Sequence, residues 1–284
     1  MIPLKDNIPT SRFPILTVLL IVVNVVAFGW QFSQSSDPGS SSHPHIQALS
    51  KQDETILEYG AVPYRLTHPG DDCAIETKLV APGSARQSVV CEGTSQYERA
   101  QGKPGIRLQS LDSPPWWMTV FTSMFMHGGI LHIAFNMLFL WIFGNNIEDS
   151  MGRPRFLLFY LLAGIVAAYA QALPDVSSTE PAIGASGAIA GVLGGYLLLY
   201  PRARVLTLIF IIFFVTLIEL PAAILLAVWF MLQFLPAIGQ VGTDAVSGGG
   251  GVAYWAHVGG FAFGLAAIKL FANRRREIPP GTYA

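Results

Sequence analysis

The chain has 284 residues and a formal net charge of −1, with 52% hydrophobic and only 12% charged residues. A soluble domain usually has about a quarter of its residues charged, so this composition excludes an ordinary soluble protein. The mean hydropathy of +0.47 and a sequence without a basic patch indicate a membrane protein with no nucleic-acid partner.

The first apolar run covers residues 14–32 (PILTVLLIVVNVVAFGWQF) and is close to the roughly 20 residues that a membrane-spanning helix needs. A signal peptide cleaved after Gly29 is the alternative, because Ala27 and Gly29 have the spacing of a cleavage site. The run is longer than a signal core of about 7–15 residues, which favours a retained anchor. We therefore predict the N-terminus and first transmembrane helix over residues 1–33.

Residues 34–115 form a polar stretch rich in Ser, Pro and Gly, which we predict to be a long extracytoplasmic loop. The loop contains the only two cysteines of the chain, Cys73 and Cys91. Oxidising conditions outside the cytoplasm favour a disulfide between them, and two unpaired thiols are the alternative.

The second apolar run, at about 117–143, includes the polar segment HGGILHIAFN (127–136). His132 and Asn136 are four residues apart and share a helix face, from which both side chains can donate hydrogen bonds to an oxyanion. His127 lies off that face, and we expect it to brace the loop. Hydrogen bonds that only hold helices together explain the same residues equally well.

A third apolar run at 156–173 is followed by Ser186, which begins the fourth run within the segment GASG (184–187). A helix N-cap or a small packing residue is the ordinary role of such a serine. The alternative is a nucleophile. Gly184 and Gly187 would then let a substrate backbone approach, and the free N–H groups at the helix start would favour an oxyanion.

The fifth apolar run, at 205–235, is long enough for two short spans around Pro221, which would make seven spans in all. Lys and Arg gather on the cytoplasmic side of membrane proteins, and they decide between the alternatives. The basic residues cluster ahead of the first run, after the second, after the fourth and after the last (Lys5, Arg12, Arg153, Arg155, Arg202, Arg204 and Arg274–Arg276). Six spans place every cluster on one side, whereas seven spans place the last cluster outside.

We therefore expect residues 205–220 to be a membrane-surface or partly buried connector and the fifth span to lie near 221–236. Glu219 beside Pro221 supports a break there, because a carboxylate in hydrocarbon is expensive.

His257 lies near the start of the last apolar run, at 253–272, within the segment AHVGG (256–260). A hydrogen bond to a neighbouring helix is an ordinary role for a membrane histidine. Gly260 and Gly264, however, form a small-residue face that lets helices pack closely, which would bring the imidazole to Ser186. With six spans both residues lie near the outer ends of their helices, whereas seven spans place them on opposite sides of the membrane.

The predicted architecture is an all-α membrane protein with six transmembrane helices and a long outer loop between helices 1 and 2. Helices 2–6 lie within residues 116–272, residues 273–284 form a short tail, and both termini are cytoplasmic. A bacterial plasma membrane is the expected location, since the sequence shows no transit peptide.

The three polar segments, in this order, resemble the rhomboid family of intramembrane serine proteases. The family pattern is a His-rich second span that ends in Asn, a G-x-S-G fourth span and an A-H-x-x-G sixth span. It reads here as HGGILHIAFN, GASG and AHVGG. The similarity also runs through residues 138–164, covers roughly 1–33 and 115–272, and is faint across the outer loop.

The resemblance implies a rhomboid catalytic core over residues 116–272 with a water-filled cavity that opens outward. Ser186 would attack the scissile carbonyl and His257 would take its proton, as a dyad, because the sequence places no carboxylate to complete a triad. Asn136, His132 and the Ser186 N–H would bind the oxyanion. Such proteases cleave transmembrane helices of other membrane proteins near their outer ends, without a metal or cofactor.

Two features depart from the family pattern. Ala190 stands where some members stack an aromatic residue on the catalytic histidine, and the outer loop lacks the Trp-Arg pair of many members. Both departures concern the geometry of the cavity and the fold of the loop.

Two other functions would use the same features. A rhomboid-like pseudoprotease would bind membrane helices without cutting them, but Ser186 and His257 are both retained. A small transporter would need polar groups deep in several spans rather than near one side. The sequence contains no H-E-x-x-H zinc motif, and it leaves the substrate and the oligomeric state open.

Overall fold

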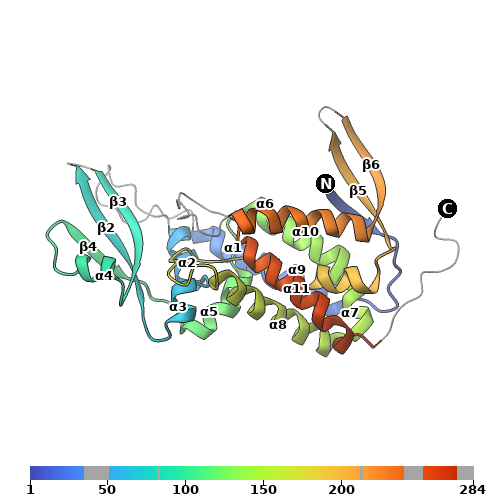
Figure 1. Ribbon diagram of the computed structural model, residues 1–284, viewed down its shortest axis with the longest axis horizontal. Helices are drawn as coiled ribbons and strands as arrows, with labels where there is room; N and C mark the ends of the chain where they lie inside the picture. The colour runs from blue at the N-terminus through green and yellow to red at the C-terminus, as the bar shows by residue number, and fades with distance from the viewer. Residues whose placement is uncertain (35–50, 82–83, 212–213, 240–251, 274–284) are drawn as a thin grey trace.

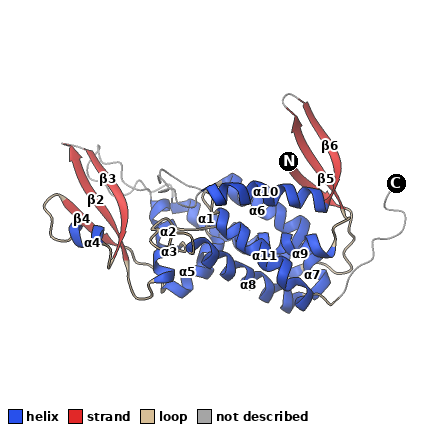
Figure 2. Cartoon of the chain, in the orientation of Figure 1, coloured by secondary structure: helices blue, strands red, loops and turns tan. Residues whose placement is uncertain are grey.

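The computed structural model describes residues 1–34, 51–81, 84–211, 214–239 and 252–273. The protein is mostly helical, with its long helices gathered in one bundle and a small β-sheet near each end (Figures 1 and 2). The bundle contains α1 (Ile15–Ser33), α6 (Ile130–Phe139), α7 (Asn145–Met151), α8 (Arg153–Ala172), α9 (Ser186–Leu199), α10 (Ala222–Gly239) and α11 (Tyr254–Phe271). A π-helical segment, Leu140–Gly144, joins α6 to α7.

Four helices in the described part of the chain are long and apolar enough to cross a membrane. They are α1, the continuous α6–α7 (Ile130–Met151), α8 and α10, and α9 is a shorter apolar helix. The mostly helical membrane architecture is thereby confirmed. The second helix starts at Ile130 rather than near residue 117, because the Gly128-Gly129 pair separates it from α5 (Trp116–Thr122).

The centre of the bundle is α9, which is buried on nearly all sides. It packs against α8 and α11, and the contact with α11 is close enough to bring backbone onto backbone. A Cβ at Gly264 would lie 2.0 Å from the carbonyl oxygen of Gly191, and a Cβ at Gly194 would lie 2.2 Å from that of Phe261. Small residues are what allow helices to approach in this way.

Two carboxylates, half-buried Asp6 and buried Glu148, attach the N-terminal segment to the bundle. Asp6, at the end of β1 (Ile2–Asp6), accepts hydrogen bonds from Asn146 Nδ2 at 2.6 Å and from the Tyr196 hydroxyl at 2.5 Å. The strand therefore reaches both α7 and α9 through one side chain.

The second carboxylate, Glu148 of α7, caps the start of α1. It accepts hydrogen bonds from the backbone N–H groups of Leu16 (3.1 Å) and Thr17 (2.8 Å) and from the Thr17 hydroxyl (2.8 Å). The first N–H groups of a helix have no partner within the helix, and a carboxylate there also suits the helix dipole. Pro14, at the N-cap position, makes no side-chain hydrogen bond, so the acceptors for these N–H groups come from Glu148, far away in the sequence.

The first sheet has the strand order β1-β5-β6 and is antiparallel throughout, with β5 at Arg204–Ile211 and β6 at Phe214–Pro221. These strands occupy the stretch expected to be a surface connector, so the prediction of an all-α fold was wrong here. The run is rich in Val, Ile, Phe and Thr, which favour strands, but an apolar run without alternation does not distinguish a strand from a helix. The following helix, α10, begins at Ala222, close to the predicted fifth span.

The second sheet lies within the predicted outer loop and again departs from an all-α fold. Its order is β3-β2-β4, with β2 at Cys73–Ala81, β3 at Ser84–Cys91 and β4 at Ile106–Ser110. Three short helices accompany it: α2 (Lys51–Tyr59), α3 (Pro63–Thr67) and α4 (Ser95–Ala100). An isolated bridge between Ala61 and Ala182, with N···O distances of 3.0 and 2.9 Å, connects this region to the segment that leads into α9.

Candidate active site

Ser186 and His257 lie side by side inside the bundle. Ser186 is the first residue of α9, and His257 lies in the first turn of α11. Only 8% of the His257 surface is exposed. The distance from Ser186 Oγ to His257 Nε2 is 2.7 Å, a good hydrogen bond. A hydroxyl and an imidazole in this contact have the arrangement of a nucleophile and its general base.

The close packing of α9 and α11 continues beside this pair. A Cβ at Gly260 would lie 2.0 Å from the carbonyl oxygen of Gly187, the residue after Ser186. A Cβ at Gly187 would lie 2.5 Å from the Ala167 Cβ of α8. The two glycines thus set the separation of the helices at the level of the Ser186–His257 hydrogen bond.

The other ring nitrogen of His257 contacts Gln233 of α10, a residue that the sequence analysis missed. The distance from His257 Nδ1 to Gln233 Oε1 is 2.8 Å. An amide oxygen only accepts, so Nδ1 carries the hydrogen and Nε2 accepts from the Ser186 hydroxyl. The signal was present in the sequence, because Gln233 is an amide within an otherwise apolar helix and polar groups are costly there.

An aromatic ring also lies against His257, from a different helix than the family pattern led us to expect. The Trp229 ring centroid is 5.8 Å from that of His257, with a tilt of 39°. Trp229 is one turn before Gln233, so both side chains come from one face of α10. Ala190, one turn after Ser186, is buried and leaves the ring contact to α10.

His132 and Asn136 of α6 surround Gly184, two residues before Ser186. A Cβ at Gly184 would lie 2.8 Å from His132 Nε2 and 3.6 Å from Asn136 Nδ2. The backbone of Gly184 has a φ of 111°, which favours glycine, and its N–H donates to the Ser123 carbonyl at 2.8 Å. Substitution of Gly184 would therefore both strain the backbone and fill this space.

Both α6 side chains offer hydrogens toward this space. The Gly128 N–H donates to His132 Nδ1 at 3.3 Å, which leaves the hydrogen of the neutral ring on Nε2, the atom nearest Gly184. Asn136 is 7% exposed, and its buried Nδ2 has no hydrogen-bond partner within the described residues. A buried donor without a partner is costly and calls for an explanation.

His127 is fully buried, and its contacts are with Gln31, Phe125 and His132. Its backbone forms two hydrogen bonds with the Gln31 side chain of α1, at 3.0 and 2.7 Å. Its ring contacts the Phe125 carbonyl through Nδ1 at 3.3 Å and packs edge-on against His132, with centroids 5.1 Å apart. These contacts hold the loop before α6 and the orientation of His132.

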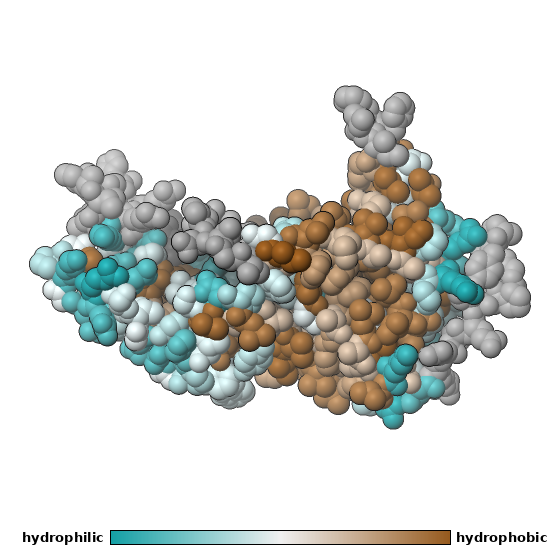
Figure 3. Space-filling model, viewed as in Figure 1, coloured by the Kyte–Doolittle hydropathy of each residue, from teal (hydrophilic) through white to brown (hydrophobic). Residues whose placement is uncertain are grey.

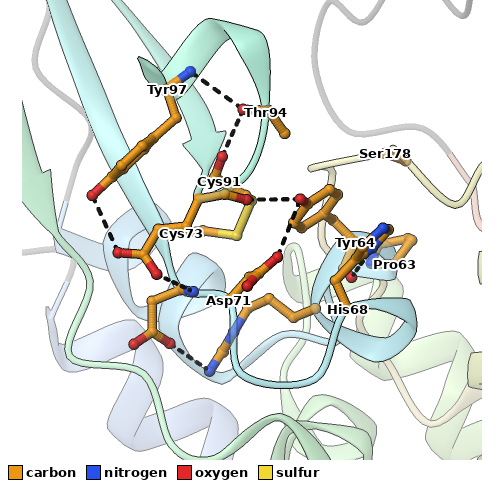
Figure 4. Close-up of a disulfide and its surroundings, with 12 residues drawn as sticks. Pro63, Tyr64, His68, Asp71, Cys73, Cys91, Thr94, Tyr97 and Ser178 are labelled. Atoms are coloured by element: carbon orange, nitrogen blue, oxygen red, sulfur yellow. Dashed lines mark hydrogen bonds and ion pairs between the residues drawn. A yellow bond between two sulfur atoms is a disulfide. The ribbon is translucent and has the colours of Figure 1, made fainter. Parts of the chain in front are cut away.

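Cys73 and Cys91 form a disulfide in the β3-β2-β4 sheet of the predicted outer loop, here named the outer sheet, which lies away from α9 and α11 (Figure 1). They are directly opposite each other on β2 and β3. Figure 4 shows Tyr64 beside the bond, where its hydroxyl donates to the Glu92 carbonyl at 2.7 Å. The disulfide thus belongs to the packing of the outer region.

The described residues contain no group of three His, Cys, Asp or Glu side chains that could hold a metal ion.

The model of the rhomboid domain matches residues 114–274, which is more than half of the chain. The rhomboid protease GluP of Bacillus subtilis is 44% identical over 93 residues, covering 33% of this chain and 18% of that protein. The putative rhomboid protease YdcA of the same organism is 36% identical over 86 residues, which are 29% and 40% of the two chains. Rhomboid protein 1, mitochondrial, of Saccharomyces cerevisiae is 32% identical over 97 residues, which are 33% and 28%. The matched part of the chain spans less than half the length of each of these relatives.

Proposed function

This chain belongs to the rhomboid family, and from that premise we propose that it is an intramembrane serine endopeptidase. It hydrolyses peptide bonds in or near transmembrane segments of other membrane proteins. The observation that carries the proposal is the 2.7 Å hydrogen bond from Ser186 Oγ to His257 Nε2 within an apolar bundle. A hydroxyl–imidazole pair beside the unpartnered Asn136 amide is the minimum that acyl transfer requires.

The reaction begins when Ser186 Oγ attacks the carbonyl carbon of the scissile bond while its proton moves to His257 Nε2. The tetrahedral intermediate collapses when the C–N bond breaks and His257 returns that proton to the leaving amine. Water then attacks the acyl-enzyme, with His257 again taking and returning one proton. The second product is the carboxylic acid, and Ser186 is regenerated.

Gln233 adds a neutral third residue to the Ser186–His257 pair. In serine proteases with a triad, the third residue holds the histidine in the correct tautomer and orientation. Gln233 Oε1 accepts from His257 Nδ1–H at 2.8 Å, which fixes both the tautomer and the orientation of the ring. Trp229, also on α10, lies against the imidazole and limits its rotation. An amide adds no negative charge, so Gln233 contributes orientation rather than stabilisation of the imidazolium.

The oxyanion binds in the space around Gly184. Asn136 Nδ2 and His132 Nε2–H supply side-chain donors, and the N–H at the start of α9 supplies a third with the favourable end of the helix dipole. The substrate oxyanion gives the buried Asn136 amide the partner that it lacks. Removing one such donor typically costs about 100–1,000-fold in rate.

The bundle has six spans in this proposal: α1, α6–α7, α8, α9, α10 and α11. Ser186 and His257 lie at the end of their helices that faces the outer sheet. β1 and the end of α11 lie at the other end, which we assign to the cytoplasm together with both termini. Residues 34–115 form the extracytoplasmic region and 116–272 the catalytic core, in a bacterial plasma membrane. A substrate helix must unwind locally before its carbonyl can be attacked. Irregular backbone is tolerated at membrane depth only where protein or water surrounds it, so the unwound segment must lie within the bundle.

Labelling with a fluorophosphonate probe tests the proposal, in parallel with cleavage of a transmembrane substrate in detergent. Wild type should be labelled and should cleave, and Ser186→Ala should do neither. Ser150→Ala is the control, because Ser150 is a buried serine on α7 whose hydroxyl donates to the Ile147 carbonyl. Labelling or cleavage retained by Ser186→Ala would refute the assignment. A folded wild type that binds membrane helices but is neither labelled nor active would be a pseudoprotease.

A further inference from the structure

The hairpin of β5 and β6 is apolar along nearly its whole length. Residues 205–218 contain no charged residue, and Thr207 and Thr216 are the polar side chains among them. The hairpin stands away from the bundle at the end where the N-terminus lies (Figure 1). It is not part of the site proposed above.

Both faces of the hairpin carry apolar side chains. The pairs Leu208–Leu217 and Phe210–Val215 lie on one face, while Thr207–Ile218 belongs to the other. Phe210, Val215 and Leu217 are 56%, 60% and 54% exposed. A ribbon in water normally has at least one polar face, so this pattern is typical of a strand pair surrounded by apolar material.

The edge strand of the hairpin supports the same conclusion. In the order β1-β5-β6, β6 is an edge strand of the described sheet. Proteins usually protect such an edge with charges, and here the charged residue of β6 is Glu219, at the base. A protein partner on one face would leave the other face and the edge exposed, whereas acyl chains would surround all of them.

The apolar surface of the hairpin continues that of the bundle. Figure 3 shows hydrophobic residues running from the helices up onto the hairpin without a polar break. On α10, which follows β6 directly, Leu232 and Leu235 are exposed in the same way. The hairpin therefore extends the surface that the bundle presents to lipid.

Charges mark the base of the hairpin. Arg204 and Glu219 form an ion pair with an N···O distance of 3.5 Å, and Arg202 is exposed next to them. The distance along the strand from Arg204 to Phe210 is about 20 Å at about 3.3 Å per residue. The arginines can thus contact lipid headgroups while the far half of the ribbon lies among acyl chains.

We propose that the β5–β6 hairpin inserts into the lipid leaflet on the side of the N-terminus, with acyl chains around both faces and headgroups at Arg202 and Arg204. The hairpin is then a lipid-embedded anchor for the start of α10. The inference needs only that the bundle spans a membrane, and it holds whether or not Ser186 is a nucleophile.

Fluorescence quenching in vesicles tests this insertion. The two native cysteines are joined to each other, so an introduced cysteine is a unique site for an environment-sensitive nitrobenzoxadiazole label. Val215→Cys and Leu217→Cys each place the label on an exposed position of β6. Ser110→Cys, on the exposed edge of the outer sheet, is the matched control. The full chain is reconstituted in phosphatidylcholine–phosphatidylglycerol vesicles with or without doxyl-labelled acyl chains.

Labels at 215 and 217 should emit at shorter wavelength than the label at 110, and should be quenched by doxyl lipid but not by aqueous iodide. The label at 110 should show the reverse. Quenching of labels 215 and 217 by iodide alone would overturn the proposal. Protection from both quenchers that disappears when the protein is diluted in lipid would also overturn it, because a second copy of the chain would then cover the hairpin.

Discussion

Replacing Gln233 by Leu tests whether α10 orients the histidine. The substitution keeps a branched side chain, one bond shorter, but removes the oxygen that accepts from His257 Nδ1–H at 2.8 Å. His257 is 8% exposed, so bulk water cannot take the place of the amide. Leaving a buried donor unsatisfied costs about 1–3 kcal/mol, which corresponds to about 5–150-fold in an equilibrium or a rate.

We therefore expect Gln233→Leu to lower kcat by about 5–150-fold with little change in KM, because Gln233 does not contact the scissile bond. The rate of fluorophosphonate labelling should fall by a similar factor. Gln233→Glu restores an acceptor and should recover most of the rate, with a shifted pH profile because its carboxylate can stabilise the imidazolium. Leu235→Ala, on the exposed side of α10, should leave kcat unchanged.

The assay is turnover of a transmembrane substrate in detergent, with the thermal transition of each variant measured in the same buffer. A structural role alone would lower the transition temperature without recovery by Gln233→Glu. Wild-type kcat and labelling rate in a folded Gln233→Leu variant would refute the role proposed for Gln233, while leaving the Ser186–His257 assignment intact.

Three further outcomes follow from the contacts described. Asn136→Ala should lower kcat by about 100–1,000-fold in the same cleavage assay, with activity still measurable; an unchanged kcat would remove Asn136 from the oxyanion site. Glu148→Ala leaves the N–H groups of Leu16 and Thr17 without acceptors, so it should lower stability by at least about 2 kcal/mol, seen as a lower thermal transition in detergent. Burial raises the pKa of Asp6 from 3.8 to about 6, so the protonated form is favoured in the fold and stability is lost as pH rises from about 4 through 6, by up to about 3 kcal/mol. Asp6→Asn should flatten the dependence of the thermal transition on pH over this range, and an equally steep dependence in the variant would contradict the assignment to Asp6.

The sequence was sufficient to identify the helical membrane bundle and the family. Polar residues in apolar helices are rare enough to draw notice, and three such segments in order indicated the rhomboid family, which the domain match confirms. The same reasoning pointed to Ser186 and His257 before their 2.7 Å contact was known. Their roles as nucleophile and base remain a proposal.

Gln233 and the two sheets were missed for different reasons. Gln233 stands alone in an apolar run, and only the tertiary packing of α10 against α11 reveals what it contacts. The β5–β6 hairpin was hidden because both of its faces are apolar, which removes the alternation that identifies a strand. Its pairing with β1 joins Ile2 to Leu208, a separation that no local pattern predicts.

The cap that Glu148 places on α1 has a consequence for biosynthesis. Thr17 and Glu148 are 131 positions apart in the chain. At about 5–20 residues per second, the ribosome adds this length in roughly 7–26 seconds, during which the start of α1 lacks its acceptor. The cap on α1 thus cannot form until α7 has been made. Until then water must satisfy these N–H groups, a stage that could be captured by stalling translation between the two residues.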